Sequence, residues 1–266
     1  MRIWASILTC LCSIHLVAQT TINTKEKTNT TAAHKILLIP FEPRMYLSEI
    51  DHHINQETKL SARQIKNSFR NGINEQLYKA FKNNKYAVVD LVEDTVKYKK
   101  DLESIYQYLQ YEYLKVPDQA NYKAPVREKQ EKKIEKGQLN VETDVENRFM
   151  NAKVSQGKVL TSLGSKYRCD LFLFVNQLEI KAAGAKNPGE LVNPNGNRKI
   201  ILHYTVYNNE LKEINSGIAE TEFAFNLNTP KKIIDKHFSA IAREISERVK
   251  KALLPKASTT SSAQDH

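Results

Sequence analysis

The stretch RKIILHYTVYNN, residues 198–209, alternates between two sets of side chains in the manner of a β-strand. The two sets are Ile200, Leu202, Tyr204 and Val206 on one side, and Ile201, His203, Thr205 and Tyr207 on the other. β-branched and aromatic residues of this kind suit the pleated surface of a sheet. CDLFLFVNQLEIKA (169–182) precedes this stretch, and EINSGIAETEFAFNL (213–227) follows it after a short turn. The three segments predict an antiparallel meander at the core of the domain.

Strand and helix signals alternate on both sides of this meander. Residues 35–41 and 86–92 are short apolar segments typical of strands, and between them Ser61 and Gln64 have the spacing of a capping box. The helix that begins there carries an apolar stripe made of Ile65, Phe69, Ile73, Leu77 and Phe81. A last amphipathic helix is predicted over 230–254, with proline at its first position. We therefore predict an α/β fold in which a mixed sheet, containing the meander, is packed by amphipathic helices.

The region before the meander is expected to add further helices. Residues 95–115 repeat with a helical period, and the segment 116–126 interrupts the pattern with two prolines. Another helix is predicted over about 143–163. We expect one α/β domain over residues 35–254 that carries a helical insertion at about 95–141.

Both ends of the chain have the composition of segments outside the folded domain. Residues 1–18 begin with Arg2, continue as an apolar segment and end at Ala18, a pattern typical of a secretory signal peptide. Residues 19–34 and 255–266 are rich in Thr, Asn and Ser and predict a disordered tether and tail. The apolar segment is shorter than the roughly 20 residues that a membrane-spanning helix needs. We expect no transmembrane segment in the mature chain.

The number and positions of the cysteines indicate in which cellular compartment the protein resides. Cys10 and Cys12 leave lipid attachment open, although Thr9 stands where bacterial lipoprotein signals usually have a small residue. Once the signal is removed, Cys169 remains as a single thiol, so an intrachain disulfide is impossible. An export signal with so little cysteine favours the bacterial periplasm or its outer membrane.

The charge pattern argues against nucleic acid as a partner. Removing Arg2 with the signal lowers the net charge of +10 to +9. The lysines are interleaved with Glu and Asp, and the densest run, VREKQEKKIEKG (126–137), is typical of a solvated helix face. No zinc-finger or RNP-type motif accompanies them.

The order of elements resembles a group of Gram-negative envelope domains. The features that carry the resemblance are ILLIPF (36–41), the transition LTSLGSKYRCDLFLFVNQLEI (160–180) and the closing helix. The group comprises the penicillin-binding-protein activator LpoB, the curli-secretion protein CsgG and the amino-terminal domain of TolB. The resemblance spans about 35–92 and 142–254, and residues 95–141 depart from it. It implies contact with another envelope protein, with the provision that a fold does not dictate function.

A catalytic or metal site is the alternative interpretation. Residues 40–53 collect Glu42, Asp51, His52 and His53. In an extended segment Asp51 and His53 face one side and His52 the other, which gives two ligands where zinc needs three or four. The other candidate ligands are His34, His203 and His237. A metal-dependent or other hydrolase that uses the 42–53 loop is therefore kept as the second hypothesis.

Other signals of chemistry are weak. The sequence contains no G-x-S-x-G motif and no glycine-rich phosphate loop. Cys169 stands at the start of a strand, where a buried structural thiol is expected. We expect no cofactor.

Residue types common at interfaces favour a binding protein. Phe41, Arg44 and Tyr46 follow a strand in a segment that Pro40 and Pro43 stiffen, although Phe41 and Tyr46 could instead complete the core. Tyr108 and Tyr111 are expected together on one helix face, where the segment 116–126 could also cover them. We predict a non-enzymatic periplasmic or outer-membrane-associated protein that binds another cell-envelope component.

Overall fold

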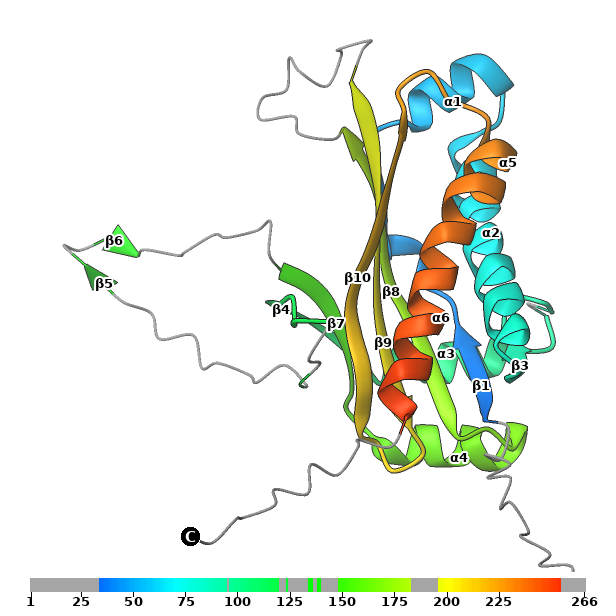
Figure 1. Ribbon diagram of the computed structural model, residues 1–266, viewed down its shortest axis with the longest axis vertical. Coiled ribbons are helices and arrows are strands. Elements are labelled where there is room, and N and C mark those ends of the chain that lie inside the picture. The colour runs from blue at the N-terminus through cyan, green and yellow to red at the C-terminus, as the bar shows by residue number, and fades with distance from the viewer. Residues whose placement is uncertain are drawn as a thin grey trace, which may run out of the picture. The chain divides into compact units, whose positions relative to one another are not determined.

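The computed structural model describes residues 34–94, 96–119, 123, 134–135, 138–139, 148–182 and 196–254. The predicted signal peptide and tail, the tether before His34, and residues 95, 120–122, 124–133, 136–137 and 140–141 of the predicted insertion lie outside these residues. Within them, a mixed sheet has helices on one face and helices with a two-stranded ribbon on the other (Figure 1). The predicted α/β fold is confirmed.

The predicted meander is confirmed as the centre of the sheet. β8 (Leu171–Ala182), β9 (Asn197–Asn208) and β10 (Glu213–Ala224) pair antiparallel. β1 (Lys35–Ile39) lies parallel to β8, and β3 (Ala87–Asp90) lies parallel to β1, so the strand order is β10-β9-β8-β1-β3. β8 and β9 are buried on both faces, whereas the later half of β10 has exposed positions.

The segment after β1 leaves the sheet and returns to it. A short 3₁₀ turn, η1 (Pro43–Met45), leads to β2 (Tyr46–Ser48), which pairs with the far part of β8. α1 (Asp51–Thr58) follows. The prediction of an extended loop is therefore wrong for residues 46–53, which form β2 and the start of α1. A free edge on β8 gives residues 46–48 a hydrogen-bonding partner that sequence periodicity does not reveal.

Four helical elements cover one face of the sheet. They are α1, α2 (Ala62–Asn83), α5 (Pro230–Ile233) and α6 (Ser239–Leu253), with a π-helical turn, η4 (Ile234–Phe238), between the last two (Figure 1). The predicted capping box is confirmed, because Ser61 N donates to Gln64 Oε1 at 2.9 Å and Ser61 Oγ accepts from Gln64 N at 3.4 Å. A Cβ at Gly72 would lie 2.6 Å from the Ile234 side chain, so this glycine permits the close packing of α2 and η4.

The other face carries α3 (Lys99–Gln107), α4 (Gly157–Tyr167) and a ribbon of β4 (Leu109–Lys115) and β7 (Arg148–Val154). The prediction of helix throughout 95–115 is wrong after residue 107, and the helix predicted over 143–163 begins only at residue 157. Residues 109–115 and 148–154 form strands because each segment provides backbone hydrogen-bond partners for the other. A further pair, β5 (Ile134–Glu135) and β6 (Gln138–Leu139), lies between them in sequence.

The described helices bear on the membrane prediction. None of them combines the length and apolar character that crossing a bilayer requires. This agrees with the expectation of no transmembrane segment.

Candidate protein-binding edge

The ribbon of β4 and β7 contacts the sheet through the edge of β7. Met150 and Ala152 stand opposite Tyr113 and Tyr111 in the register. In an antiparallel pair, the backbone groups of alternate residues point toward the partner strand and away from it. Met150 and Ala152 point theirs away from β4, toward the sheet.

Side chains of the sheet hold the backbone of Met150. Its N–H donates to His203 Nδ1 at 2.9 Å, and its carbonyl accepts from Asn176 Nδ2 at 2.8 Å. Asn176 stands at a shift in the β8–β9 register between Val175 and Gln177, so a bulge directs its amide to the ribbon. Two side chains of the sheet thus make the two hydrogen bonds that a neighbouring strand would otherwise make with Met150.

Ala152 is held in the same way one step along β7. Its N–H donates to Thr205 Oγ1 at 3.2 Å, and its carbonyl accepts from the Tyr207 hydroxyl at 2.8 Å. With the two bonds at Met150, all four outward-facing backbone groups of these residues have side-chain partners. The edge of β7 is therefore closed by the face of the sheet.

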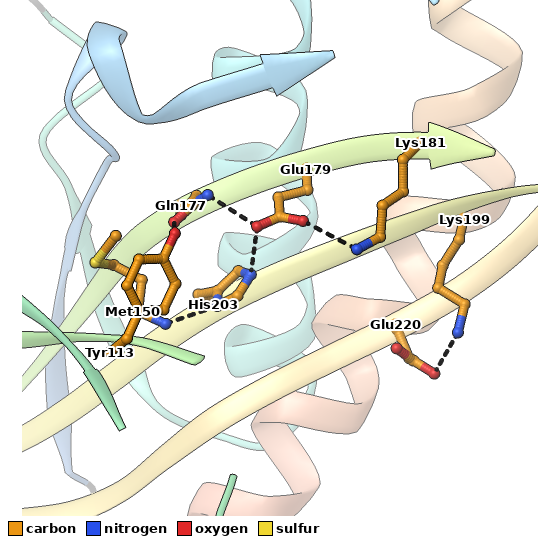
Figure 2. Close-up of polar contacts among 8 residues, drawn as sticks. All are labelled: Tyr113, Met150, Gln177, Glu179, Lys181, Lys199, His203 and Glu220. Atoms are coloured by element: carbon orange, nitrogen blue, oxygen red, sulfur yellow. Dashed lines mark hydrogen bonds and ion pairs between the residues drawn. The ribbon is translucent and has the colours of Figure 1, made fainter. Parts of the chain in front are cut away.

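His203 belongs to this structural contact. Because Nδ1 accepts from a backbone N–H, the proton of the neutral ring is on Nε2, which lies 3.3 Å from Glu179 Oε1 (Figure 2). The residue is 3% exposed. Both ring nitrogens face protein groups, so the ring is not placed to act as a free general base.

Glu179 continues the polar contacts along β8. It accepts from Gln177 Nε2 at 2.8 Å and lies 3.4 Å from Lys181 Nζ, while Gln177 Oε1 accepts from the Tyr113 hydroxyl at 3.4 Å (Figure 2). Burial acts to raise the pKa of Glu179, but the nearby His203 ring and Lys181 ammonium lower it below the ordinary value. A continuous polar row thus links the sheet to β4.

The outer edge of β4 is open. Ser155 N donates to Tyr108 O at 2.9 Å, so Tyr108 directs its backbone toward β7. Because this direction alternates along a strand, the backbone N–H and C=O groups of residues 110, 112 and 114 also point to β7. The backbone groups of Tyr111 and Tyr113 point the other way. In the described part of the chain, no group hydrogen-bonds to them. Among the described residues, the backbone donors and acceptors on this edge of β4 therefore have no partner.

Aromatic and cationic side chains border this open edge. Tyr113 is 49% exposed. The Arg44 guanidinium lies 6.0 Å from the centre of the Tyr111 ring, and its Nε donates to Glu42 Oε2 at 2.8 Å. Burial, with the Glu42 charge, raises the pKa of Tyr111 above its ordinary value. The Arg44 side chain remains 68% exposed, so it is available to a partner.

The structure separates the predicted partner-binding residues. Phe41 is fully buried and its carbonyl accepts from Arg70 Nε at 3.0 Å. Tyr46 is partly buried and stacks on Phe41 with ring centres 6.3 Å apart. These two complete the core, the alternative already considered, and their expected role in a surface contact is corrected. Arg44 alone of the three remains exposed at the surface.

The tyrosines are also redistributed. Tyr108 follows the last turn of α3 and Tyr111 lies in β4, so the two do not share a helix face. Both are partly buried, whereas Tyr113 is half exposed. The alternation of LQYEYLK (109–115) is the signal that could have revealed the strand.

The proposed metal ligands of the 42–53 loop are not arranged as a site. Asp51 accepts from the Tyr46 hydroxyl at 2.6 Å. His52 and His53 lie in α1 with ring centres 3.7 Å apart and ring planes tilted by 41°. The other candidate ligands lie on separate elements, His34 before β1, His203 in β9 and His237 in η4. Across the described ranges, no three His, Cys, Asp or Glu side chains gather where a metal ion could bind.

Cys169 is buried beside α4, as expected for a structural thiol. Burial raises its pKa to about 11, so the reactive thiolate is scarce at neutral pH.

Comparison with known proteins adds little. No family model matches the chain, and no curated protein matches it in sequence. Among solved structures, the chain is similar to the hypothetical protein CT253 from Chlamydia trachomatis, with 10% sequence identity and a TM-score of 0.37. The match covers 82% of this chain and 98% of that chain. No functional conclusion is drawn from it, and the resemblance to the LpoB, CsgG and TolB group stays a prediction.

Proposed function

We propose that this protein is a non-enzymatic, exported binding protein that joins another cell-envelope component through the open edge of β4. The contrast between the two edges of one ribbon carries the proposal. The outward backbone groups of Met150 and Ala152 all have side-chain partners, whereas those of Tyr111 and Tyr113 have none among the described residues. An extended segment of a partner would complete them by adding a strand.

The side chains near the edge support selective binding. Tyr113 and Arg44 are exposed residue types that often carry interface energy. Glu112 and Lys115 lie in the same strand, and charges on an edge discourage indiscriminate pairing. A partner strand therefore has to match both the backbone and this arrangement of aromatic and charged groups.

The location of the partner rests on the sequence. The signal-peptide pattern of residues 1–18 supports export, and the interleaved charges support a protein partner over nucleic acid. The proposed partner is thus an envelope protein in the periplasm or at the outer membrane.

Photocrosslinking in cells tests this function. A photoreactive amino acid replaces Arg44 beside the edge, and in a matched control it replaces Arg243, an exposed arginine of α6 on the opposite face of the sheet. We expect a discrete adduct with an envelope protein from position 44 and none from position 243. Absence of an adduct at position 44, or the same adducts from both positions, would contradict the proposal.

A further inference from the structure

A second feature lies at the other end of the sheet, where β9 begins. Arg198 stands near the start of β9, on the face covered by helices, opposite Phe223 of β10. α1 and the connection from β10 to α5 lie at this same end (Figure 1). Although Arg198 carries a charge, the residue is 1% exposed. A buried guanidinium requires acceptors for its five N–H groups.

Only one side of this guanidinium has acceptors among the described residues. Nη1 donates to Asn228 Oδ1 at 2.7 Å and lies 3.4 Å from Leu227 O. Nε and Nη2 are buried and have no hydrogen-bond partner. Within the described ranges, no carboxylate forms a hydrogen bond or an ion pair with Arg198. The cation is therefore buried without a paired anion, which is costly unless something supplies one.

The two vacant donors belong to the same edge of the guanidinium. Nε–H and Nη2–H point in parallel, and this edge is the one that holds two oxygens of a carboxylate or phosphate at once. Nη1 and Asn228 meanwhile fix the orientation of the group. The arrangement is that of a preorganised fork with its acceptor missing.

The surroundings of the fork are aromatic, and Arg198 itself supplies the positive charge. The guanidinium carbon lies 4.5 Å from the centre of the Phe225 ring, whose centre is 5.6 Å from that of His53 on α1. Burial, the neighbouring His52 and the Arg198 charge all lower the pKa of His53. Glu57 is the acidic group whose charge reaches Arg198, but its side chain is exposed and forms no ion pair with it. The positive charge of the buried guanidinium, with Nε and Nη2 unpartnered, is what favours an anion at the fork.

We propose that Arg198 is the centre of an oxyanion site that binds a carboxylate or phosphate group through Nε and Nη2. Phe225 and His53, which are only partly buried, move aside to admit the group. This site is separate from the β4 edge, and neither depends on the other.

NMR titration of the folded protein tests the site with sodium acetate and inorganic phosphate as separate probes, each at constant ionic strength set with chloride. We expect the Arg198 Nε–H signal to shift and saturate with at least one probe below about 20 mM. A shift with acetate alone assigns a carboxylate ligand, and a shift with phosphate alone assigns a phosphate. Failure of both probes to move this signal would overturn the proposal.

Variants then distinguish binding by two parallel N–H donors from binding by positive charge alone. Arg198→Lys keeps a cation but cannot present two parallel donors, so we expect binding to weaken by about tenfold or more. Unchanged affinity in this variant, with its fold verified by circular dichroism, would refute the fork. Glu57→Gln should leave binding unchanged or tighter. If wild type does not bind and Glu57→Gln does, then Glu57 fills the fork itself and no external ligand is needed.

Discussion

A proline at position 113 distinguishes strand addition from contacts made by side chains alone. The N–H of Tyr113 points away from β7, so Tyr113→Pro removes a donor from the open edge and no ladder bond within the ribbon. Proline also places a ring where a partner strand would approach. The folded protein should lose little, within about 1 kcal/mol, because an exposed edge tolerates proline.

The effect on binding follows from the unpaired group that the proline creates. A partner carbonyl left without a donor in a closed interface costs about 1–3 kcal/mol, which corresponds to roughly 5- to 150-fold in Kd. The assay is the yield of the crosslinked adduct from position 44, followed by the Kd of the purified partner. Tyr113→Val is the matched control, since it keeps the N–H and the extended backbone but removes the ring.

The two variants together decide the mode of binding. We expect Tyr113→Pro to lose far more adduct than Tyr113→Val, while Glu112→Pro, which removes an N–H directed at β7, unfolds the ribbon. Full binding by a folded Tyr113→Pro protein would refute strand addition. Equal losses in the proline and valine variants would instead assign the binding energy to the ring.

Four further predictions concern the stability of the fold, the reactivity of Cys169 and the N-terminus of the exported protein. Phe174 is 1% exposed, so Phe174→Ala should cost about 3–5 kcal/mol and sharply lower Tm; an unchanged Tm would remove β8 from the core. The lowered pKa of Glu179 stabilises the fold above its unfolded pKa of about 4.3, and this contribution is lost as the pH falls through the folded value. Glu179→Gln should therefore reduce the acid-induced fall in Tm, and an identical pH profile would contradict this. Cys169 should resist iodoacetamide at pH about 7.5 until the protein unfolds, and rapid labelling of the folded chain would disprove its burial. Mass spectrometry of the exported protein should find an unacylated N-terminus at or near Gln19, whereas a lipidated Cys10 or Cys12 would overturn that address.

Local signals in the sequence were sufficient to predict the elements whose formation depends little on distant segments. Alternation over 198–209 predicted β9 because a strand buried on both faces needs suitable side chains at every position. The pair Ser61 and Gln64 predicted the start of α2 because both capping bonds lie within four residues. Pro230 marked the last helical region for the same local reason.

Tertiary structure alone decided the ribbon, the role of His203 and the open edge. The segment 109–115 contains good helix formers as well as alternating tyrosines, and pairing with β7 selected the strand. His203 binds the backbone of Met150, 53 residues away, a contact that no local pattern encodes. Every residue except proline has the same backbone donor and acceptor, so the sequence does not specify which edge is paired. That depends on which distant segments fold against the edge, and among the described segments the sheet closes β7 while none pairs with the outer edge of β4.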